Sequence, residues 1–325
     1  LLAFLASCLS CDNDSKNPVS PDRNTQENPF SSSDSLVVDD FLGYQIERSE
    51  TGYLNTYDLQ NAESLAESYR KSGMEFFVVT SPYKTLDENN VPIVHYWFGE
   101  YRNPVTTCHT AFGYYRYYME TLHEGYKQSF LNNIKWLYEN CDDNYYLRYQ
   151  FNWEHVHGID LLSGWISAMA QGEALAAMCM AYNLTGSQKY LKTAEGLFTT
   201  LYKNTDTTWC YMIDGKGYYW LEEYPNGDFC HVLNGFLFGL WGIWDYYVIT
   251  GDEFALTLFE AGIKSILDNL SFWNIEEKDM SKYCSHIIVE DYHVIHQTQF
   301  KAYADLLNIP EFNEAAELFI QTAAP

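Results

Sequence analysis

Two adjacent carboxylates and a tyrosine, Glu222, Glu223 and Tyr224, follow a short aromatic segment that is typical of a strand. The sequence Pro-Asn-Gly comes directly after them and favours a turn. A phenol can exchange protons when nearby positive charge lowers its pKa, ordinarily about 10, and a neighbouring carboxyl group can share the proton. The three residues therefore indicate proton-transfer chemistry, with a plain hydrogen-bonded turn as the alternative.

A long apolar segment at about 231–248 follows this turn and contains Gly235, Gly239 and Gly242. A helix that is apolar on all sides is buried within the protein. Glycine lowers helix propensity, so we expect a neighbouring helix to approach closely at these positions. Glu223 and Tyr224 would then stand on a turn just ahead of a buried helix.

From about residue 104 the chain repeats a unit of two helices. In two copies the first helix ends at Thr-Gly, where Gly186 and Gly251 are expected to supply left-handed caps. Ser187 and Asp252 then precede the second helix as N-caps. A weaker copy has Pro310 in the first turn of its second helix, and an initial pair at 106–121 and 127–140 precedes them all.

The links between these pairs are long, at about 141–163, 204–230 and 271–290. Each runs from the end of a second helix to the start of a first helix, so all three are expected on the same face. Loops longer than ~12–15 residues are usually functional or disordered, and these are rich in Tyr, Trp and His. The sequence predicts a mainly α fold, an (α/α) toroid of about four helical hairpins, with an aromatic cleft over one mouth.

Residues 221–244, which contain EEYP and HVLNGF, resemble the D-glucuronyl C5-epimerases, which make iduronate within heparan-type chains. WISAMAQGEAL at 165–175 and DYHVIH at 291–296 resemble the same family, and the similarity runs from about residue 103 to the end. The resemblance implies an isomerase that acts on glucuronate in a glycosaminoglycan such as heparan sulfate or heparosan.

The resemblance also implies the catalytic residues, Glu223, Tyr224, Tyr283 and Tyr292. Inversion at carbon 5 requires a base on one side of the sugar, an acid on the other, and a group that neutralises the carboxylate as it becomes enolate-like. The family pattern around the second tyrosine resembles Ser-x-Tyr-Asp-Leu-Arg-His, whereas this chain reads SKYCSH. The arginine that would meet the carboxylate is missing, and Lys282 or His286 is a candidate to replace it.

Other residues are expected to line the cleft and to bind the sugar. His293 and His296 are three residues apart on a predicted helix, a spacing that could also ligate a metal. No third ligand is evident, so hydrogen bonds to sugar or carboxylate are favoured, and we expect neither a metal nor a cofactor. The full expected set is Trp153, Glu154, His155, Trp165, Gln171, Asn234, His286, His293 and His296.

The chain begins with an apolar run that ends in Leu-Ala-Ser-Cys, a pattern typical of bacterial lipoprotein signals in which Cys8 is lipidated. A polar tract then predicts a disordered tether. We expect a signal and tether at 1–34, a small β-rich part at 35–103 and the toroid catalytic domain at 104–325. The protein would be exported and held to a membrane, on the periplasmic or cell-surface side, only through its lipid.

Within residues 35–103 the pattern predicts a helix at about 58–72 and strands at 76–80 and 93–98. After Cys8, seven cysteines remain with no CxxC pair, which favours buried free thiols for most of them.

The formal net charge of −25 argues against nucleic acid and anionic membrane surfaces as partners. It is also unfavourable for a polyanionic substrate, so a local basic patch would be needed. The candidates for such a patch are Arg102, Arg116, Arg148, Lys216 and Lys282.

We therefore predict an exported epimerase that converts glucuronate to iduronate in a uronate-containing polysaccharide. One alternative is a uronate polysaccharide lyase or uronyl hydrolase on a related toroid. Another is a glycan-binding lipoprotein without catalysis, which the altered segment after Tyr283 keeps open. The sequence leaves open whether the protein forms a homodimer.

Overall fold

The computed structural model describes most of the chain from residue 54 onward. The described ranges are 54–68, 77, 79–154, 160–203, 208–214, 216–225, 230–275, 280–285 and 289–321. The predicted signal and tether lie outside them, and so do Cys8, His155 and His286.

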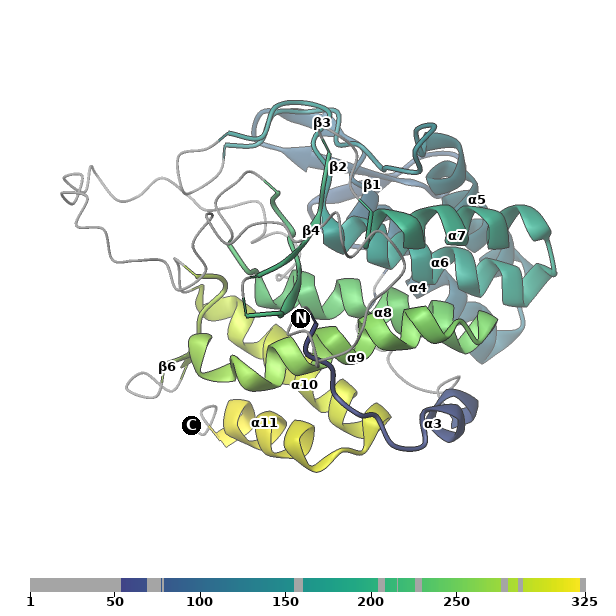
Figure 1. Ribbon diagram of the computed structural model, residues 1–325. Coiled ribbons are helices and arrows are strands. Elements are labelled where there is room, and N and C mark those ends of the chain that lie inside the picture. Colours follow the sequence, from purple (N-terminus) through teal and green to yellow (C-terminus); the bar gives the residue numbers. More distant parts are fainter. Residues whose placement is uncertain are drawn as a thin grey trace, which may run out of the picture.

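Four consecutive helical hairpins form the body of the described chain (Figure 1). α6 packs against both α4 and α8, and α8 packs against α10, so the first helices of the hairpins form an inner arc. The (α/α) toroid that the sequence predicts is confirmed. The pairs are α4 (Pro104–Thr121) with α5 (Glu124–Asn140), α6 (Ala168–Thr185) with α7 (Gln188–Thr200), α8 (Leu233–Thr250) with α9 (Glu253–Asp268), and α10 (Glu290–Leu307) with α11 (Pro310–Gln321).

The short links within the hairpins follow the predicted cap chemistry. Gly186 and Gly251 both take the left-handed conformation, each with a φ of 68°. Asp252 accepts hydrogen bonds from two backbone N–H groups of α9, at 2.8 and 3.3 Å. Ser187 holds the same place before α7 without a side-chain cap bond. Pro310 is the first residue of α11, where its missing N–H costs nothing.

Glycines allow α6 and α8 to approach closely. A Cβ on Gly172 of α6 would collide with the backbone of Gly239, and a Cβ on Gly242 would collide with the carbonyl of Gly172. The close approach predicted at Gly239 and Gly242 is confirmed. Gly235 differs, because a Cβ there would meet the carboxyl group of Glu223 rather than a neighbouring helix.

A three-stranded antiparallel sheet lies before the toroid, with β1 (Lys84–Leu86), β2 (Pro92–Tyr96) and β3 (Gly99–Tyr101) in that order. α3 (Ala62–Ser68) precedes it, within the range predicted to be helical.

Two of the strand predictions need correction. The strand predicted at 93–98 ends at Tyr96, and residues 97 and 98 form the turn to β3. The described residues of the strand predicted at 76–80 are not strand. These apolar residues pack on α4. The ring centroids of Phe77 and Phe112 are 4.7 Å apart, and Val79 lies against Gly113.

Two further hairpins stabilise the second and third long links. β4 (Tyr211–Ile213) pairs with β5 (Tyr219–Leu221), which leads directly into Glu222. η3 (Leu270–Phe272) precedes β6 (Asn274–Ile275), which pairs with β7 (Met280–Ser281) just before Tyr283. In Figure 1, β4 and the three-stranded sheet are drawn above α8 and α9. The links are thus held in place by local strand pairing.

The described cysteines are free thiols, and all but Cys141 are buried. No helix in the described part of the chain is long and apolar enough to cross a membrane.

Candidate active site

Two tyrosines from different long links meet hydroxyl to hydroxyl. The Oη atoms of Tyr224 and Tyr283 are 3.2 Å apart, and both side chains are buried. Tyr292, near the start of α10, packs its ring on Tyr283 with centroids 4.4 Å apart. We call these three residues the tyrosine cluster. Four residues bury it, Leu161, Cys230, Val232 and Cys284, and Trp153 and Trp165 pack at its edge.

Backbone hydrogen bonds between the links fix this cluster. The N–H of Leu233, at the start of α8, donates to the carbonyl of Tyr283 at 3.0 Å. The N–H of Ser285 donates to the carbonyl of Cys230 at 2.7 Å, so the third link pairs with the segment before α8. The N–H of Ala168 donates to the carbonyl of Glu222 at 3.0 Å, which ties the second link to the start of α6.

Glu223 lies beside the cluster as a buried carboxyl group of high pKa. Burial is the main cause that raises its pKa to about 8, and the nearby carboxylates of Glu173 and Glu222 add to the effect. A hydrogen bond with Tyr224 acts in the opposite direction. Oε2 of Glu223 has no hydrogen-bond partner among the described residues. A carboxylate of this pKa is a far stronger base than an ordinary glutamate.

Glu222 has a structural partner instead. Its Oε1 lies 2.5 Å from Nδ1 of His231, and both side chains are completely buried. The backbone N–H of His231 donates to Oε2 of Glu222 at 3.2 Å, and the imidazole stacks on Trp220 with centroids 4.2 Å apart. This pair closes the turn between β5 and α8. Of the two adjacent glutamates, Glu223 is therefore the one whose carboxyl group faces the tyrosines.

A second buried histidine–carboxylate pair lies on the inner helices, and it was not predicted from the sequence. Nε2 of His109 on α4 is 2.6 Å from Oε1 of Glu173 on α6. Burial raises the pKa of Glu173, and the His109 partner opposes this rise. Burial also raises the pKa of Tyr149 well above its usual range, helped by Tyr96, Glu223 and Glu173. The available signal was a lone glutamate within the apolar run AMAQGEALAAM.

Two tryptophans flank the tyrosine cluster. Trp165 stacks on Tyr149 with centroids 3.8 Å apart, and its ring lies 6.1 Å from that of Tyr224. Trp153 forms two backbone hydrogen bonds with Leu161, at 2.8 and 2.9 Å. Both tryptophans are partly exposed, and Glu154, next to Trp153, is exposed. The first long link thus provides an aromatic wall beside the tyrosines.

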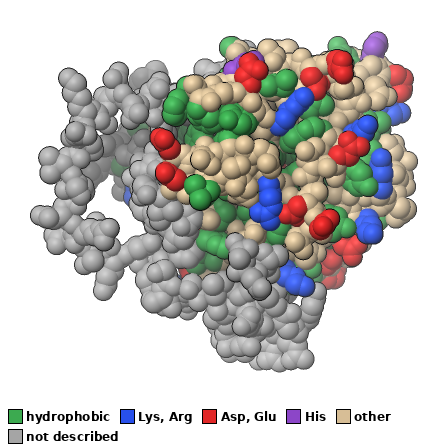
Figure 2. Space-filling view, turned by 90° about the horizontal axis from the view of Figure 1, so that it is seen from above, with side chains coloured by type: hydrophobic (Ala, Val, Ile, Leu, Met, Phe, Trp, Pro, Cys, Tyr) green, Lys and Arg blue, Asp and Glu red, His purple; other side chains and the backbone are tan. Residues whose placement is uncertain are grey.

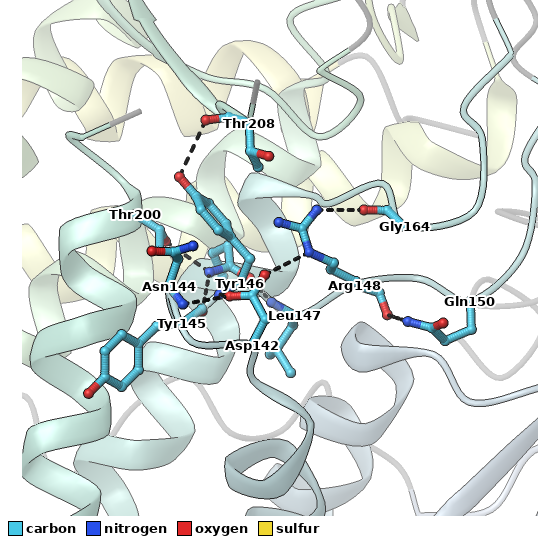
Figure 3. A network of polar contacts seen from close by, with 11 residues as sticks. Asp142, Asn144, Tyr145, Tyr146, Leu147, Arg148, Gln150, Gly164, Thr200 and Thr208 are labelled. Atoms are coloured by element: carbon cyan, nitrogen blue, oxygen red, sulfur yellow. Dashed lines mark hydrogen bonds and ion pairs between the residues drawn. The ribbon is translucent and has the colours of Figure 1, made fainter. Parts of the chain in front are cut away.

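Gln171, predicted to bind substrate, holds the first long link in place. Its Oε1 accepts a hydrogen bond from the N–H of Leu147 at 2.9 Å. Its Nε2 donates to the carbonyl of Tyr145 at 3.0 Å and to Oγ1 of Thr200 at 2.9 Å. Figure 3 shows this part of the link, where Arg148 bonds to Asp142 and to the carbonyl of Gly164. Gln171 is completely buried, so its amide is committed to the fold.

Asn234, also predicted to bind substrate, is buried at the start of α8. Its backbone carbonyl accepts a hydrogen bond from Nε2 of Gln299 at 3.0 Å. Its Oδ1 has no partner among the described residues.

The two histidines of α10 both bond to Ser281. The N–H and Oγ of Ser281 lie 3.0 and 2.9 Å from Nδ1 of His293, and Oγ lies 2.7 Å from Nδ1 of His296. Burial lowers the pKa of both, that of His296 to about 3, so both rings are neutral at physiological pH. They fasten α10 to β7 next to Tyr283. Within the described ranges, no three His, Cys, Asp or Glu residues converge as metal ligands.

Four of the cations predicted to form a basic patch have separate side-chain partners. Arg102 bonds to the carboxylate of Asp87 and to the carbonyl oxygens of Val91 and Pro92, at the start of β2. Arg148 bonds to Asp142, and Nζ of Lys282 lies 5.6 Å from the centre of the Phe272 ring. Arg116 lies 3.7 Å from Glu120 on the surface of α4, and the carbonyl of Lys216 accepts a hydrogen bond from Asn55.

The sequence model of the family described as D-glucuronyl C5-epimerase C-terminus matches residues 139–321 of this chain. This range is more than half of the chain and contains the whole tyrosine cluster. The chain belongs to the D-glucuronyl C5-epimerase family. The membership predicted from EEYP and the two accompanying motifs is confirmed. The D-glucuronyl C5-epimerase of Caenorhabditis elegans is 32% identical over 123 residues, which are 34% of this chain and 20% of that protein.

An uncharacterized protein of Methanocaldococcus jannaschii, MJ1128, is 29% identical over 143 residues, 43% of this chain and 46% of that protein. The chain therefore matches less than half the length of these relatives. Among solved structures, cellobiose 2-epimerase from Bacillus thermoamylovorans has a TM-score of 0.49 at 13% identity, over 80% of this chain and 71% of that one. An unsaturated glucuronyl hydrolase from Streptococcus agalactiae has a TM-score of 0.46 at 12% identity, over 83% and 85%.

Proposed function

We propose that this protein is an isomerase that inverts carbon 5 of D-glucuronate residues in a polysaccharide and so produces iduronate. Family membership supports the substrate class. The observation that carries the proposal is the arrangement of Glu223, Tyr224 and Tyr283, a basic buried carboxylate bonded to one of two tyrosines whose hydroxyls are 3.2 Å apart. These are the groups that a two-sided proton exchange requires.

In the proposed cycle the sugar enters between the two hydroxyls. The oxygen of Tyr224 takes the proton from carbon 5 while its own proton passes to Glu223, whose pKa of about 8 suits it to this role. The electron pair left on carbon 5 is delocalised into the substrate carboxylate. Tyr283 then returns its proton to carbon 5 from the opposite face, which inverts the centre and leaves a phenolate.

The contact between the two hydroxyls explains how the enzyme is reset. Once the product leaves, Tyr224 passes its proton across the 3.2 Å contact to the phenolate of Tyr283. Glu223 gives its proton back to Tyr224 and becomes a carboxylate again. The cycle consumes no cofactor, and the number of protons on the three groups is the same before and after it.

A heavy-water experiment tests this proposal. With heparosan as substrate, we expect solvent deuterium at carbon 5 and some iduronate, without shortening of the chain, because the hydroxyls of Tyr224 and Tyr283 exchange their protons with solvent between turnovers. Tyr224→Phe removes one proton carrier and little volume. The rate of deuterium exchange should therefore fall about a thousandfold, which is within the range that a single general acid–base group contributes to a rate. Tyr219→Phe is the matched control, because this tyrosine of β5 is outside the cluster and its buried hydroxyl donates to the carbonyl of Leu201.

The outcomes separate three classes of protein. Normal exchange in Tyr224→Phe would remove this residue from the mechanism. Unsaturated uronates with ultraviolet absorbance would indicate a lyase, which expels the substituent at carbon 4 after the same first step. Binding without exchange would indicate a glycan-binding protein. The last outcome has a specific observation in its favour, since the segment after Tyr283 reads Cys-Ser-His in place of the family's Asp-Leu-Arg-His.

We also propose, from the sequence alone, that the protein is exported and lipidated at Cys8. The chain expressed with its N-terminal segment should then fractionate with membranes, and Cys8→Ala should release it. Unchanged membrane association of that variant would contradict lipidation. Light scattering of the soluble form would establish whether it is a homodimer.

A further inference from the structure

The turn between β2 and β3 carries two aromatic residues where tight hairpin turns favour Asn and Gly. Tyr96 pairs with Gly99 across the hairpin, so Trp97 and Phe98 are the two turn residues. Gly99, the first residue of β3, follows the turn with a positive φ of 147°. Trp97 is 76% exposed, the highest value among the large hydrophobic side chains of the described residues. Neither turn geometry nor burial in the core accounts for a tryptophan at this position.

The hairpin holds this tryptophan at a fixed place on the toroid. Tyr96, just before the turn, is buried, and its hydroxyl accepts a hydrogen bond from Nδ2 of Asn103 at 2.7 Å. Asn103 is also the N-cap of α4, where its Oδ1 accepts from the N–H of Thr106 at 3.1 Å. The N–H of His95 donates to the carbonyl of Tyr83 at 2.8 Å. The tip is therefore tied to the start of an inner helix.

A row of aromatic rings connects the tip with the candidate active site. The ring of Trp97 lies 5.1 Å from that of Phe98, edge to face, and Phe98 lies 6.3 Å from Trp153. Trp153 packs at the edge of the tyrosine cluster. Phe98 and Trp153 are partly exposed, so the row has a solvent-facing side. Figure 2, which views the molecule from above, shows hydrophobic side chains gathered in patches between scattered charges on the face that it draws.

We propose that Trp97 and Phe98 form an outer subsite that stacks against a sugar ring of the polysaccharide, several units away from the glucuronate that reacts. The choice of ligand rests on the proposed function. Trp97 presents a flat apolar face, and such rings are the side chains that most often dominate a binding surface. Nδ1 of His95 lies 2.9 Å from Oε1 of Glu100, so this carboxyl group next to Gly99 already has a hydrogen-bond partner.

A second copy of the protein is a less suitable occupant than a sugar chain. A stable interface needs about 800 Å² from each partner, whereas one tryptophan buries about 150–250 Å². A sugar chain that is bound at the active site is already held near Trp97. Stacking one further sugar ring on Trp97 then adds affinity at little extra entropic cost.

The experiment compares binding of long and short ligands. Isothermal titration would measure the Kd of heparosan polymer and of a heparosan tetrasaccharide for the native protein, Trp97→Ala, Trp97→Tyr and the control Met119→Ala, an exposed residue of α4 (54% exposed). We expect Trp97→Ala to weaken polymer binding by about five- to thirtyfold and to leave tetrasaccharide binding unchanged. Trp97→Tyr should retain most of the polymer affinity, and Met119→Ala should behave as the native protein.

Three results would overturn the subsite. These are equal losses for polymer and tetrasaccharide, no loss for either ligand, or a change in the oligomeric state of Trp97→Ala by light scattering. Because titration needs no turnover, the subsite and the reaction fail separately. A length-dependent loss without deuterium exchange would retain the subsite and reject the epimerase. Exchange without any effect of Trp97→Ala would do the reverse.

Discussion

Gly235 gives the carboxyl group of Glu223 the space it occupies. A Cβ at position 235 would collide with Oε2 of Glu223 and would lie 2.9 Å from its Cβ. The sequence indicated a special role for this glycine, but the reason was expected to be a neighbouring helix. The difference could not be predicted, because α8 carries three glycines at similar spacing and only the fold shows which of them faces the turn.

We expect Gly235→Ala to displace Glu223. Overpacking of this kind costs about 1–3 kcal/mol, and a misplaced base lowers deuterium exchange at least about tenfold. A double-mutant cycle checks the cause, since Glu223→Ala removes the side chain that the new methyl group would strike. The free energy of unfolding should fall on Gly235→Ala in the native background and rise or stay constant in the Glu223→Ala background. Equal losses in both backgrounds would mean that the methyl group strikes something else.

At the scale of elements, Ser281 and the two histidines of α10 connect a short strand to a long helix. The oxygen of Ser281 lies between Nδ1 of His293 and Nδ1 of His296, two residues before Tyr283. The sequence predicted both histidines as ligands of sugar or carboxylate, because their spacing could also suit a metal but no third metal ligand was evident. Their bonds to Ser281 depend on a contact between β7 and α10, and no local pattern reveals which strand will meet a helix.

We expect this junction to make the protein sensitive to acid. Burial, with a smaller contribution from His293, lowers the pKa of His296 to about 3 in the folded state, against about 6.5 when unfolded. As the pH falls from about 6.5 towards 3, the unfolded chain therefore binds a proton that the folded chain does not. His296 alone should then remove about 1.4 kcal/mol of stability per pH unit.

Urea unfolding at pH 6.5 and pH 5 measures this dependence. His296→Gln should lose about 1.6 kcal/mol less than the native protein between these two pH values, whatever its stability at pH 6.5. His123→Gln, at the exposed N-cap of α5, serves as the control. Glu223 acts in the opposite sense, because its raised pKa makes stability fall as the pH rises from about 4.5 to 8. An unchanged pH dependence in His296→Gln would show that the ring is protonated in the folded protein.

At the scale of the molecule, the repeated helix pairs and their caps could be predicted from the sequence, because each depends on residues that are only a few positions apart. Glu223 and Tyr224 were singled out by residue type and turn chemistry, and the contact of Tyr224 with Tyr283 joins two links 59 residues apart. The pair of His109 and Glu173 was missed for the same reason, since it joins two inner helices. Local chemistry predicts elements, whereas contacts between distant elements require the fold.

The net charge of −25 leads to a prediction about salt. Several described cations are already paired with acids, so the field around the protein should repel a polyuronate at long range. Screening shortens this repulsion, because the Debye length falls from about 30 Å at 0.01 M salt to about 8 Å at 0.15 M. We therefore expect the Kd of heparosan polymer to decrease severalfold as salt rises over this range, the reverse of most proteins that bind polyanions. Titrations at several salt concentrations, with a neutral polysaccharide of similar length as the control, measure this effect. A steep increase of Kd with salt would instead reveal cations that converge on the cleft, and would place the missing positive charge of the family pattern elsewhere in this chain.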